Sequence, residues 1–155
     1  MSIRRATPAD IEALVGLMDE VHDLHVAHLP WVFRPALQRE MLAYFDELLD
    51  SPEARVYLAC AGEEAVGYLL LLILDQPAAP MMERRRSLYI ESIGVTVRHR
   101  GQGYGRALLE TARAVAGELG LVRIELDTWG FNEPAHAFFR RHGFGTMCVR
   151  MVAEV

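Results

Sequence analysis

Apolar residues recur at helical spacing in two segments near the N-terminus. Thr7-Pro8-Ala9-Asp10 has the composition of a helix start, with Thr as the N-cap, Pro in the first turn and an acidic residue behind it. From Ile11 to Val21 the apolar residues fall three and four positions apart, which predicts an amphipathic helix. The segment from His22 to Pro35 contains two prolines and predicts a helix end and a loop. A second amphipathic helix is expected from Leu37 to Leu49.

The rest of the chain alternates between extended apolar runs and helical segments. Strands are expected at 3–6, 55–61, 65–74, 87–97, 121–127 and 146–153, and helices at 103–119 and 132–142. Gly62-Glu63-Glu64 predicts a hairpin turn, and Gly120 and Gly143 are placed to end the two later helices. This order of elements predicts an α/β domain of the α+β type, with one mixed sheet and helices on both faces.

Length and charge restrict the classes of function. A chain of 155 residues fits one domain, expected to cover residues 1–155. The formal net charge of −5 argues against nucleic acid as a partner, because no overall positive field exists to attract phosphates. All sixteen basic residues are arginine, which excludes a lysine-dependent phosphate loop and a lysine Schiff base.

Cysteine usage and hydropathy indicate a cytoplasmic protein without a membrane partner. Cys60 and Cys148 lie in separate apolar runs and cannot form a four-cysteine zinc site or a CxxC pair. No apolar stretch follows the N-terminal residues, so no signal peptide is expected. The longest apolar run, Ala65 to Leu74, is about half as long as a membrane span.

The most informative motif is a glycine-rich loop between an expected strand and an expected helix, Arg100-Gly101-Gln102-Gly103-Tyr104-Gly105. Glycines at alternate positions leave the backbone amides uncovered, and the amides and dipole of a helix N-terminus bind anions. Arg98, Arg100 and Arg106 add positive charge, so a pyrophosphate is the expected ligand. A dinucleotide fingerprint fits poorly, because the spacing is G-x-G-x-G and three strands precede the loop.

With a second motif about thirty residues later, the chain resembles the GNAT superfamily of acetyl-CoA-dependent N-acetyltransferases. Residues 100–105 match the family's Q/R-x-x-G-x-G/A signature, after an apolar strand end, Ile93-Gly94-Val95. Residues 132–144 are similar to the family's N-x-x-A-x-x-F-Y-x-x-x-G-F stretch, and the opening residues 3–10 also look like a GNAT N-terminus. The resemblance implies a mostly antiparallel sheet of about six to seven strands with about four helices. The sheet should be splayed between its fourth and fifth strands.

The resemblance also implies a binding site for acetyl-CoA as co-substrate. Backbone groups near Ile93 and Val95 would hold the pantetheine arm, and the amides from Gln102 to Arg106 would hold the pyrophosphate. Asn132 matches an asparagine on the pantetheine side, although an N-cap is an equally good role for it. The residues expected to bind the cofactor are Ile93, Val95, Arg100, Gly101, Gln102, Gly103, Tyr104, Gly105, Arg106, Asn132 and Phe139.

Glu91 is the candidate general base for deprotonating the acceptor amine. It alternates in phase with Ile93 and Val95 and is an acid in an otherwise apolar strand, a setting that can raise its pKa. The alternative for Glu91 is a solvated side chain. Phe139 stands where the family usually has a general-acid tyrosine, so a water or another donor would have to protonate the thiolate. Tyr89, Ser92 and Cys148 are the candidate donors.

In the family, the acceptor pocket forms from the first two helices, the loop between them and the loop before the fourth strand. The residues expected to line it here are His25, His28, Trp31, Phe33 and Trp129. His22, His25 and His28 have a spacing that could hold a metal, but no metal is expected because nearby acids suggest a solvated helix end. Arg84-Arg85-Arg86 is either a solvated loop or a contact for an acceptor carboxylate or the CoA 3′-phosphate.

Three hypotheses about function follow. The first is direct transfer of an acetyl group from acetyl-CoA to a primary amine in a ternary complex. The second is a catalytically weak or silent acyl-CoA-binding regulatory module, suggested by Phe139. The third is a dinucleotide-binding domain, which the loop spacing opposes. The acceptor would be a small-molecule or peptide amine, and a homodimer is expected only by analogy with the family.

Overall fold

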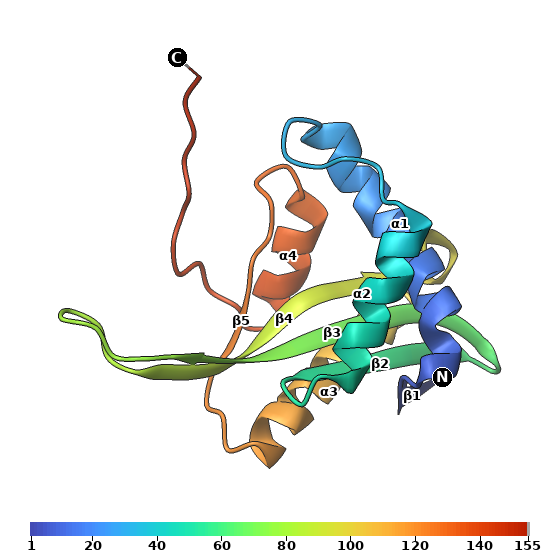
Figure 1. Ribbon diagram of the computed structural model, residues 1–155, viewed down its shortest axis with the longest axis horizontal. Coiled ribbons are helices and arrows are strands. Elements are labelled where there is room, and N and C mark those ends of the chain that lie inside the picture. The colour runs from blue at the N-terminus through green and yellow to red at the C-terminus, as the bar shows by residue number, and fades with distance from the viewer. Residues whose placement is uncertain (155) are drawn as a thin grey trace.

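The computed structural model describes residues 1–154, and over these residues it forms one five-stranded sheet covered by helices on both faces (Figure 1). Two short 3-10 turns, η1 and η2, precede α1 and α3. The elements in chain order are β1 (Ser2–Arg5), η1 (Pro8–Asp10), α1 (Ile11–His28), α2 (Gln38–Asp50), β2 (Ala54–Ala61), β3 (Glu64–Gln76), β4 (Arg85–Val95), η2 (Val97–His99), α3 (Tyr104–Glu118), β5 (Ile124–Leu126) and α4 (Glu133–Arg141).

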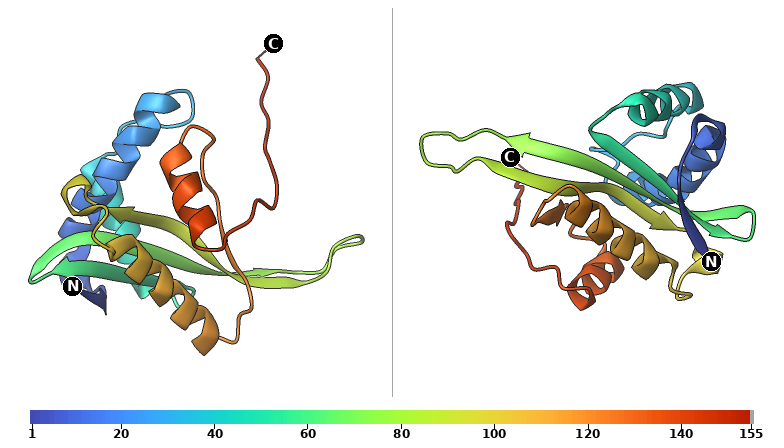
Figure 2. Two further views of the ribbon diagram at one scale, coloured as in Figure 1. Left: turned by 180° about the vertical axis from the view of Figure 1, so that it is seen from behind. Right: turned by 90° about the horizontal axis from the view of Figure 1, so that it is seen from below.

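The strands follow the chain order β1-β2-β3-β4-β5 across the sheet. The first four strands pair antiparallel and β5 pairs parallel to β4, as expected for a mixed, mostly antiparallel sheet. Helices α1 and α2 cover one face, and α3 and α4 cover the other (Figure 2). The chain must cross the sheet to make the parallel β4–β5 pair, and α3 provides that crossover.

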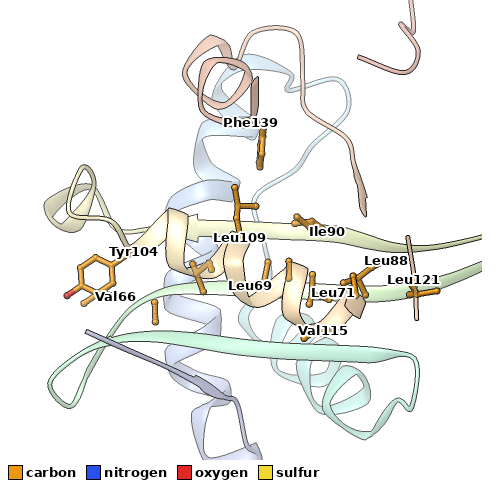
Figure 3. Close-up of a cluster of buried hydrophobic side chains, with 14 residues drawn as sticks. Val66, Leu69, Leu71, Leu88, Ile90, Tyr104, Leu109, Val115, Leu121 and Phe139 are labelled. Atoms are coloured by element: carbon orange, nitrogen blue, oxygen red, sulfur yellow. The ribbon is translucent and has the colours of Figure 1, made fainter. Parts of the chain in front are cut away.

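Each face of the sheet has its own apolar core. On the α3 side, Leu69 and Leu71 of β3 and Leu88 and Ile90 of β4 pack against α3 (Figure 3). On the α1 and α2 side, Tyr68 and Leu70 of β3 pack with Leu14 and Phe45. Strand β3 therefore contributes to both cores, which explains why its sequence is a continuous apolar run rather than an alternation.

The expected helix start at Thr7 is present as the N-cap of the 3-10 turn η1, and Asp10, the predicted acid, is the N-cap of α1 that follows. The carboxylate accepts hydrogen bonds from the Thr7 backbone N–H and hydroxyl at 2.8 Å and from both terminal nitrogens of Arg4, at 2.8 and 2.6 Å. The hydrogen bonds from Arg4 are the largest cause of a pKa for Asp10 well below its usual range. Helix α1 extends past Val21 to His28, because the next proline after the helix start comes only at position 30.

The expected number of six to seven strands is wrong for the described residues, since the sheet has five. Residues 146–153, expected as the last strand, form no strand and are exposed. The expected strand at 121–127 is reduced to Ile124–Leu126, because only three of its residues pair with β4. The expected loop at 75–86 is shorter, because cross-strand pairs from Asp75 and Gln76 to Arg86 and Arg85 extend the β3–β4 hairpin.

None of the helices within residues 1–154 has the length and apolar character needed to cross a bilayer.

A close approach between β3, β4 and α1 depends on Gly94. A Cβ at this position would lie 2.6 Å from Cε1 of the buried Tyr68 and 2.9 Å from a methyl of Val21. We expect Gly94→Ala to lower the free energy of unfolding by about 2 to 3 kcal/mol, as overpacking of a filled core does. Urea denaturation monitored by circular dichroism measures this change.

Gly16→Ala is the matched control for this prediction. Gly16 lies inside α1 with nothing within 4 Å of a built Cβ, so alanine should stabilise the protein by up to about 1 kcal/mol. Equal effects of the two substitutions would show that the contact at Gly94 does not restrict the packing.

Candidate functional site

The glycine loop leads into the N-terminus of α3 with a row of free backbone amides. Gly101 and Gly103 have φ values of 75° and 91°, in the left-handed region that favours glycine, and Gly103 is the N-cap of α3. The first hydrogen bond of the helix runs from the Ala107 N–H to the Gly103 carbonyl at 3.0 Å. Within residues 1–154, no protein group accepts a hydrogen bond from the amides of residues 101 to 106. These amides and the helix dipole can bind an anion.

The shape of this loop is held by side-chain bonds to its own backbone. The Gln102 amide donates to the Arg98 carbonyl at 2.9 Å, and Nε of Arg100 donates to the Val95 carbonyl at 3.0 Å. Thr96 and His99 share a hydrogen bond of 2.9 Å at the turn after β4. Arg98 and Arg100 thus belong to the loop that the free amides line, although Arg100 also lies 3.5 Å from Glu20.

Strands β4 and β5 separate beside this loop, as the resemblance implies. Their pairing covers only Leu88 to Ile90 of β4 and stops before Glu91. On the other edge of β4, the Thr96 N–H bonds the Val66 carbonyl at 2.9 Å, which sets the alternation of the backbone groups. By that alternation the N–H and C=O groups of Ile93 and Val95 point away from β3, toward the gap. An extended ligand lying there could pair with the backbone as another strand does.

Helix α4 packs on α3 with its N-terminus capped by Asn132. The Asn132 side-chain oxygen accepts a hydrogen bond from the Ala135 N–H at 3.2 Å, so the N-cap role is present. Gly105 allows the two helices to approach, since a Cβ there would lie 3.1 Å from the Phe138 ring. Phe139 is buried in the core on the α3 side and points toward Leu109 in Figure 3. Its ring packs edge to face against the rings of Phe138 and Phe144.

Glu91 lies at a bulge in β4, which changes the face on which it is expected. The pairing passes from Leu70–Ser92 to Leu71–Ile90, so Glu91 is the extra residue on β4. Ile90, Ile93 and Val95 all belong to the core on the α3 side, although a regular strand would place Ile90 opposite the other two. The expected phase of Glu91 with Ile93 and Val95 is therefore wrong, because the bulge breaks the alternation there.

The bulge places Glu91 among acidic and phenolic groups. Glu91 is exposed as a residue, but its carboxyl group is partly shielded from water by its neighbours. This shielding, and after it the charge of Asp127, raises the pKa of Glu91 above its usual value. Burial and the charge of Glu91 raise the pKa of Tyr44, on α2, to about 12. Since Tyr44 packs against the core on the α1 and α2 side, Glu91 faces that side of the sheet. A carboxylate at this position, with its pKa raised above the usual value, can serve as a general base for a bound amine.

The three candidate proton donors differ in their surroundings. The Tyr89 hydroxyl donates to Asp127 at 3.1 Å, and burial with this hydrogen bond raises the pKa of Tyr89 to about 12. The Ser92 hydroxyl shares a 2.7 Å hydrogen bond with the buried Tyr68 hydroxyl. Cys148 lies in the exposed C-terminal segment. Tyr89 is therefore the candidate that shares the surroundings of Glu91, through Asp127.

Aromatic rings from α1, the α1–α2 loop and the loop after β5 form one cluster. His25 stacks on Phe33 with ring centroids 5.1 Å apart, and Phe33 meets Trp129 edge to face at 5.1 Å. His28 stacks on Phe131 at 4.3 Å. Four of the five expected acceptor-side residues thus contact this cluster, whereas Trp31 is 69% exposed and has no aromatic contact within the described chain. The sequence analysis did not predict Phe131 or Asp127 as site residues.

Each of the three histidines of α1 has its own partners: His22 and His28 bond backbone carbonyls, and His25 stacks on Phe33. His22 donates through Nε2 to the Arg34 carbonyl at 2.7 Å, and His28 donates through Nδ1 to the Leu24 carbonyl at 2.9 Å. Burial, followed by the charges of His22 and His28, lowers the pKa of His25. The described part of the chain contains no group of three His, Cys, Asp or Glu side chains that could hold a metal ion.

Comparison with known families identifies the class of protein. The model of the acetyltransferase (GNAT) family matches residues 18–144, which include the glycine loop, Glu91 and α4. The chain therefore belongs to the GNAT acetyltransferase family. No curated protein sequence matches the chain.

Solved structures share the whole fold. A tetramutant of the BH1408 protein from Bacillus halodurans is 27% identical with a TM-score of 0.92, over 100% of this chain and 100% of that one. The aminoglycoside 6'-N-acetyltransferase AAC(6')-IG from Acinetobacter haemolyticus is 20% identical with a TM-score of 0.78, over 100% and 99%. The aminoglycoside N-acetyltransferase AAC(6')-Iy, solved in complex with CoA, is 18% identical with a TM-score of 0.81, over 99% and 93%.

Proposed function

We propose that this protein transfers the acetyl group of acetyl-CoA to a primary amine by direct attack in a ternary complex. The observation that carries the proposal is the meeting of two backbone features that no helix or strand partner satisfies. One is the row of free amides at the start of α3, and the other is the edge of β4 at Ile93 and Val95, where the Val95 carbonyl accepts a hydrogen bond from Nε of Arg100. A pyrophosphate fits the first and an amide-containing arm fits the second, and acetyl-CoA has both groups in one molecule.

The chain's own residues supply specific interactions with this co-substrate. The amides from Gln102 to Arg106 would bind the pyrophosphate oxygens, and Arg98 and Arg100 lie in the same loop. The outward backbone groups of Ile93 and Val95 would orient the pantetheine arm along β4. The thioester would then lie in the gap between β4 and β5. An amine bound beside it reacts with a thioester that is already in place, and not with one arriving from solution. That proximity supplies a large part of the rate enhancement.

In the transfer, the neutral amine nitrogen attacks the thioester carbonyl carbon and the carbon–sulfur bond breaks. Glu91 accepts the proton that the nitrogen loses, directly or through a water molecule. The leaving thiolate takes a proton from water or from Tyr89, and the products are the acetylated amine and free CoA. Phe139 is buried in the core and cannot donate this proton.

The acceptor side favours a cationic amine. Glu91 and Asp127 bring two carboxyl groups to the end of β4, and the charge of Asp127 raises the pKa of Glu91. The rings of Phe33 and Trp129, from the α1–α2 loop and the loop after β5, offer faces that attract an ammonium group. We expect the same acids to attract the protonated amine before it is deprotonated for attack.

Asp127→Asn tests the electrostatic control of Glu91. The substitution removes the negative charge that helps to raise the pKa of Glu91, so that pKa should fall. Because the base must be deprotonated, activity is lost as pH falls through the pKa of Glu91. The acidic limb of kcat against pH, measured at saturating acceptor, should therefore move to lower pH. Asp19→Asn, on α1, is the control and should leave the limb in place.

The alternative function is an acyl-CoA-binding regulatory module that is catalytically weak or silent. The observation that favours it is Phe139, which stands at the position of the family's usual acid tyrosine and is 8% exposed. Such a module would bind acetyl-CoA and release no thiol in the presence of amines.

The experiment that separates the two functions measures binding and turnover on the same sample. Calorimetry with acetyl-CoA, and NAD as the control ligand, tests the cofactor. Thiol release across a panel of small amines, amino acids and peptides then tests the reaction. Binding with thiol release supports the enzyme. Binding without release across the panel supports the regulatory module, and no binding of acetyl-CoA contradicts both.

A further inference from the structure

The consecutive leucines of β3, residues 69–72, cannot by themselves fix where the bulge in β4 lies. The pairing shifts between Leu70 and Leu71, and Glu91 is the extra residue on β4. If the bulge moved by one residue, one leucine would replace another as the partner, so the apolar contacts would change little. The side chain of Glu91 would nevertheless turn to the opposite face of the sheet, because strand side chains alternate. The position of the bulge therefore depends on a group other than these leucines.

The hydroxyl group of Tyr68 makes one pairing different from the others. Tyr68 is the direct partner of Gly94, and its ring lies over that glycine, since a Cβ there would be 2.6 Å from Cε1 and 3.3 Å from Cζ of the ring. From this position the hydroxyl reaches diagonally along β4 to Ser92, with which it shares a hydrogen bond of 2.7 Å. Ser92 directly follows Glu91, so this bond holds the residue next to the bulge.

The packing around Tyr68 does not require a hydroxyl group. Tyr68 is fully buried, and its cluster on the α1 and α2 side includes Leu14, Phe45 and Leu70. A phenylalanine would make the same apolar contacts, whereas a buried hydroxyl costs free energy unless it has a partner. Burial raises the pKa of Tyr68 to about 12, so the hydroxyl stays protonated at neutral pH. A buried polar pair of this kind can select one strand register among several of similar stability.

We propose that the hydroxyl pair formed by Tyr68 and Ser92 fixes the bulge of β4 at Glu91 and so keeps the general base on the α1 and α2 side of the sheet. The inference rests on the proposed role of Glu91 as the base. Tyr68 lies on that same side of the sheet, as does Tyr44, whose pKa responds to the charge of Glu91. Tyr68 and Ser92 are positioning residues, because they act on the reaction through Glu91.

The first test measures the pKa of Glu91 and does not depend on acetyl transfer. Carbon-13 NMR titration of the full chain with labelled glutamate follows the Glu91 carboxyl, whose signal is assigned by its loss in Glu91→Gln. The titratable groups that face this carboxyl are Asp127, Tyr44 and Tyr89. In Tyr68→Phe the pKa of Glu91 should fall toward the usual value for glutamate, since the displaced carboxyl loses its shielding and the nearby charge of Asp127.

Three further variants serve as controls for the titration. Ser92→Ala should lower the pKa of Glu91 as Tyr68→Phe does, and Ser92→Thr, which keeps a hydroxyl, should retain the wild-type value. Tyr57→Phe removes the same group from the neighbouring strand β2, where Tyr57 packs on the α3 side, and should change nothing. An unchanged pKa of Glu91 in both Tyr68→Phe and Ser92→Ala overturns the proposal, as does an equal change in Tyr57→Phe.

The second test shows whether the hydroxyl pair acts through Glu91. Tyr68→Phe should lower kcat about tenfold, because a catalytic group that is displaced by a fraction of an ångström loses much of its effect. The affinity for acetyl-CoA should stay within about twofold, because the free amides of the α3 loop lie outside the affected pairing. In a Glu91→Gln background, Tyr68→Phe should lower kcat no further. An equal loss in both backgrounds would show a general structural role and overturn the proposal.

The two tests separate this inference from the proposed function. If the wild type releases no thiol, or if Glu91→Gln keeps the wild-type rate, the proposed role of Glu91 is wrong, and the titration alone decides whether the hydroxyl pair holds the bulge. If Glu91→Gln slows the reaction and Tyr68→Phe does not, the role of the base is supported and the positioning role of the hydroxyl pair is overturned.

Discussion

Gly103→Glu is expected to weaken acetyl-CoA binding by at least about 100-fold, equivalent to roughly 3 kcal/mol. Gly103 is the N-cap of α3 and lies within the row of free amides of residues 101 to 106. A glutamate there would cover those amides and place a negative charge where the pyrophosphate is proposed to bind, at the positive end of the helix dipole. Calorimetric titration of wild type and variant with acetyl-CoA measures the change.

The control for this prediction is Gly120→Glu. Gly120 also has a positive φ, of 65°, and also adjoins α3, but at the opposite end of the helix. Both variants therefore carry the same added charge and the same kind of backbone strain. We expect Gly120→Glu to lose stability and to bind acetyl-CoA as tightly as wild type. Equal weakening in both variants would mean that strain, and not the anion site, explains the loss.

Glu91→Gln is expected to lower kcat by about 100- to 10,000-fold, the range over which a general base contributes. Glutamine keeps the size of the side chain and cannot accept the proton of the amine. Glu91 lies at the β4 bulge, outside the loop that is proposed to bind the pyrophosphate, so affinity for acetyl-CoA should stay within about twofold. Steady-state thiol release at saturating acetyl-CoA, together with calorimetry, separates the two effects.

The pH profile of Glu91→Gln adds a readout that a structural role would not change. Because the pKa of Glu91 is raised, the wild-type rate should fall as pH drops through that pKa, and the variant should lack this limb. Glu63→Gln, in the exposed β2–β3 turn, is the control and should keep both rate and profile. If Glu91→Gln keeps the wild-type rate and pH profile, Glu91 is not the base, and water or another group accepts the proton.

The glycine loop shows what local sequence can specify. Gly101 and Gly103 adopt the left-handed conformations that their position before a helix requires, and the amides of that loop are free as the pattern predicts. The N-cap of α4 at Asn132 is equally local, because the side chain bonds an amide three residues ahead. These features can be predicted from sequence because the residues that interact lie within one helical turn of each other in the chain.

The side of the sheet on which Glu91 lies could not be predicted from local sequence. Alternation along residues 89–95 predicted one face, and the bulge against Leu70 and Leu71 of β3 moved Glu91 to the other. A bulge arises from the pairing of two strands that are about twenty residues apart in sequence. The aromatic cluster has the same origin, since Phe131 meets His28 only when the loop after β5 lies against α1.

The sequence by itself determined the order of the helices, the strands of the sheet core, the anion-binding loop and the family resemblance. Each of these depends on periodicity or on contacts within a few residues. Only the tertiary structure decided the five-strand sheet of residues 1–154, the bulge of β4 at Glu91 and the exposure of residues 145–154. Residues 146–153 have the alternation of a strand, but a strand forms only where an edge is available to pair with it. The availability of an edge is a property of the assembled fold.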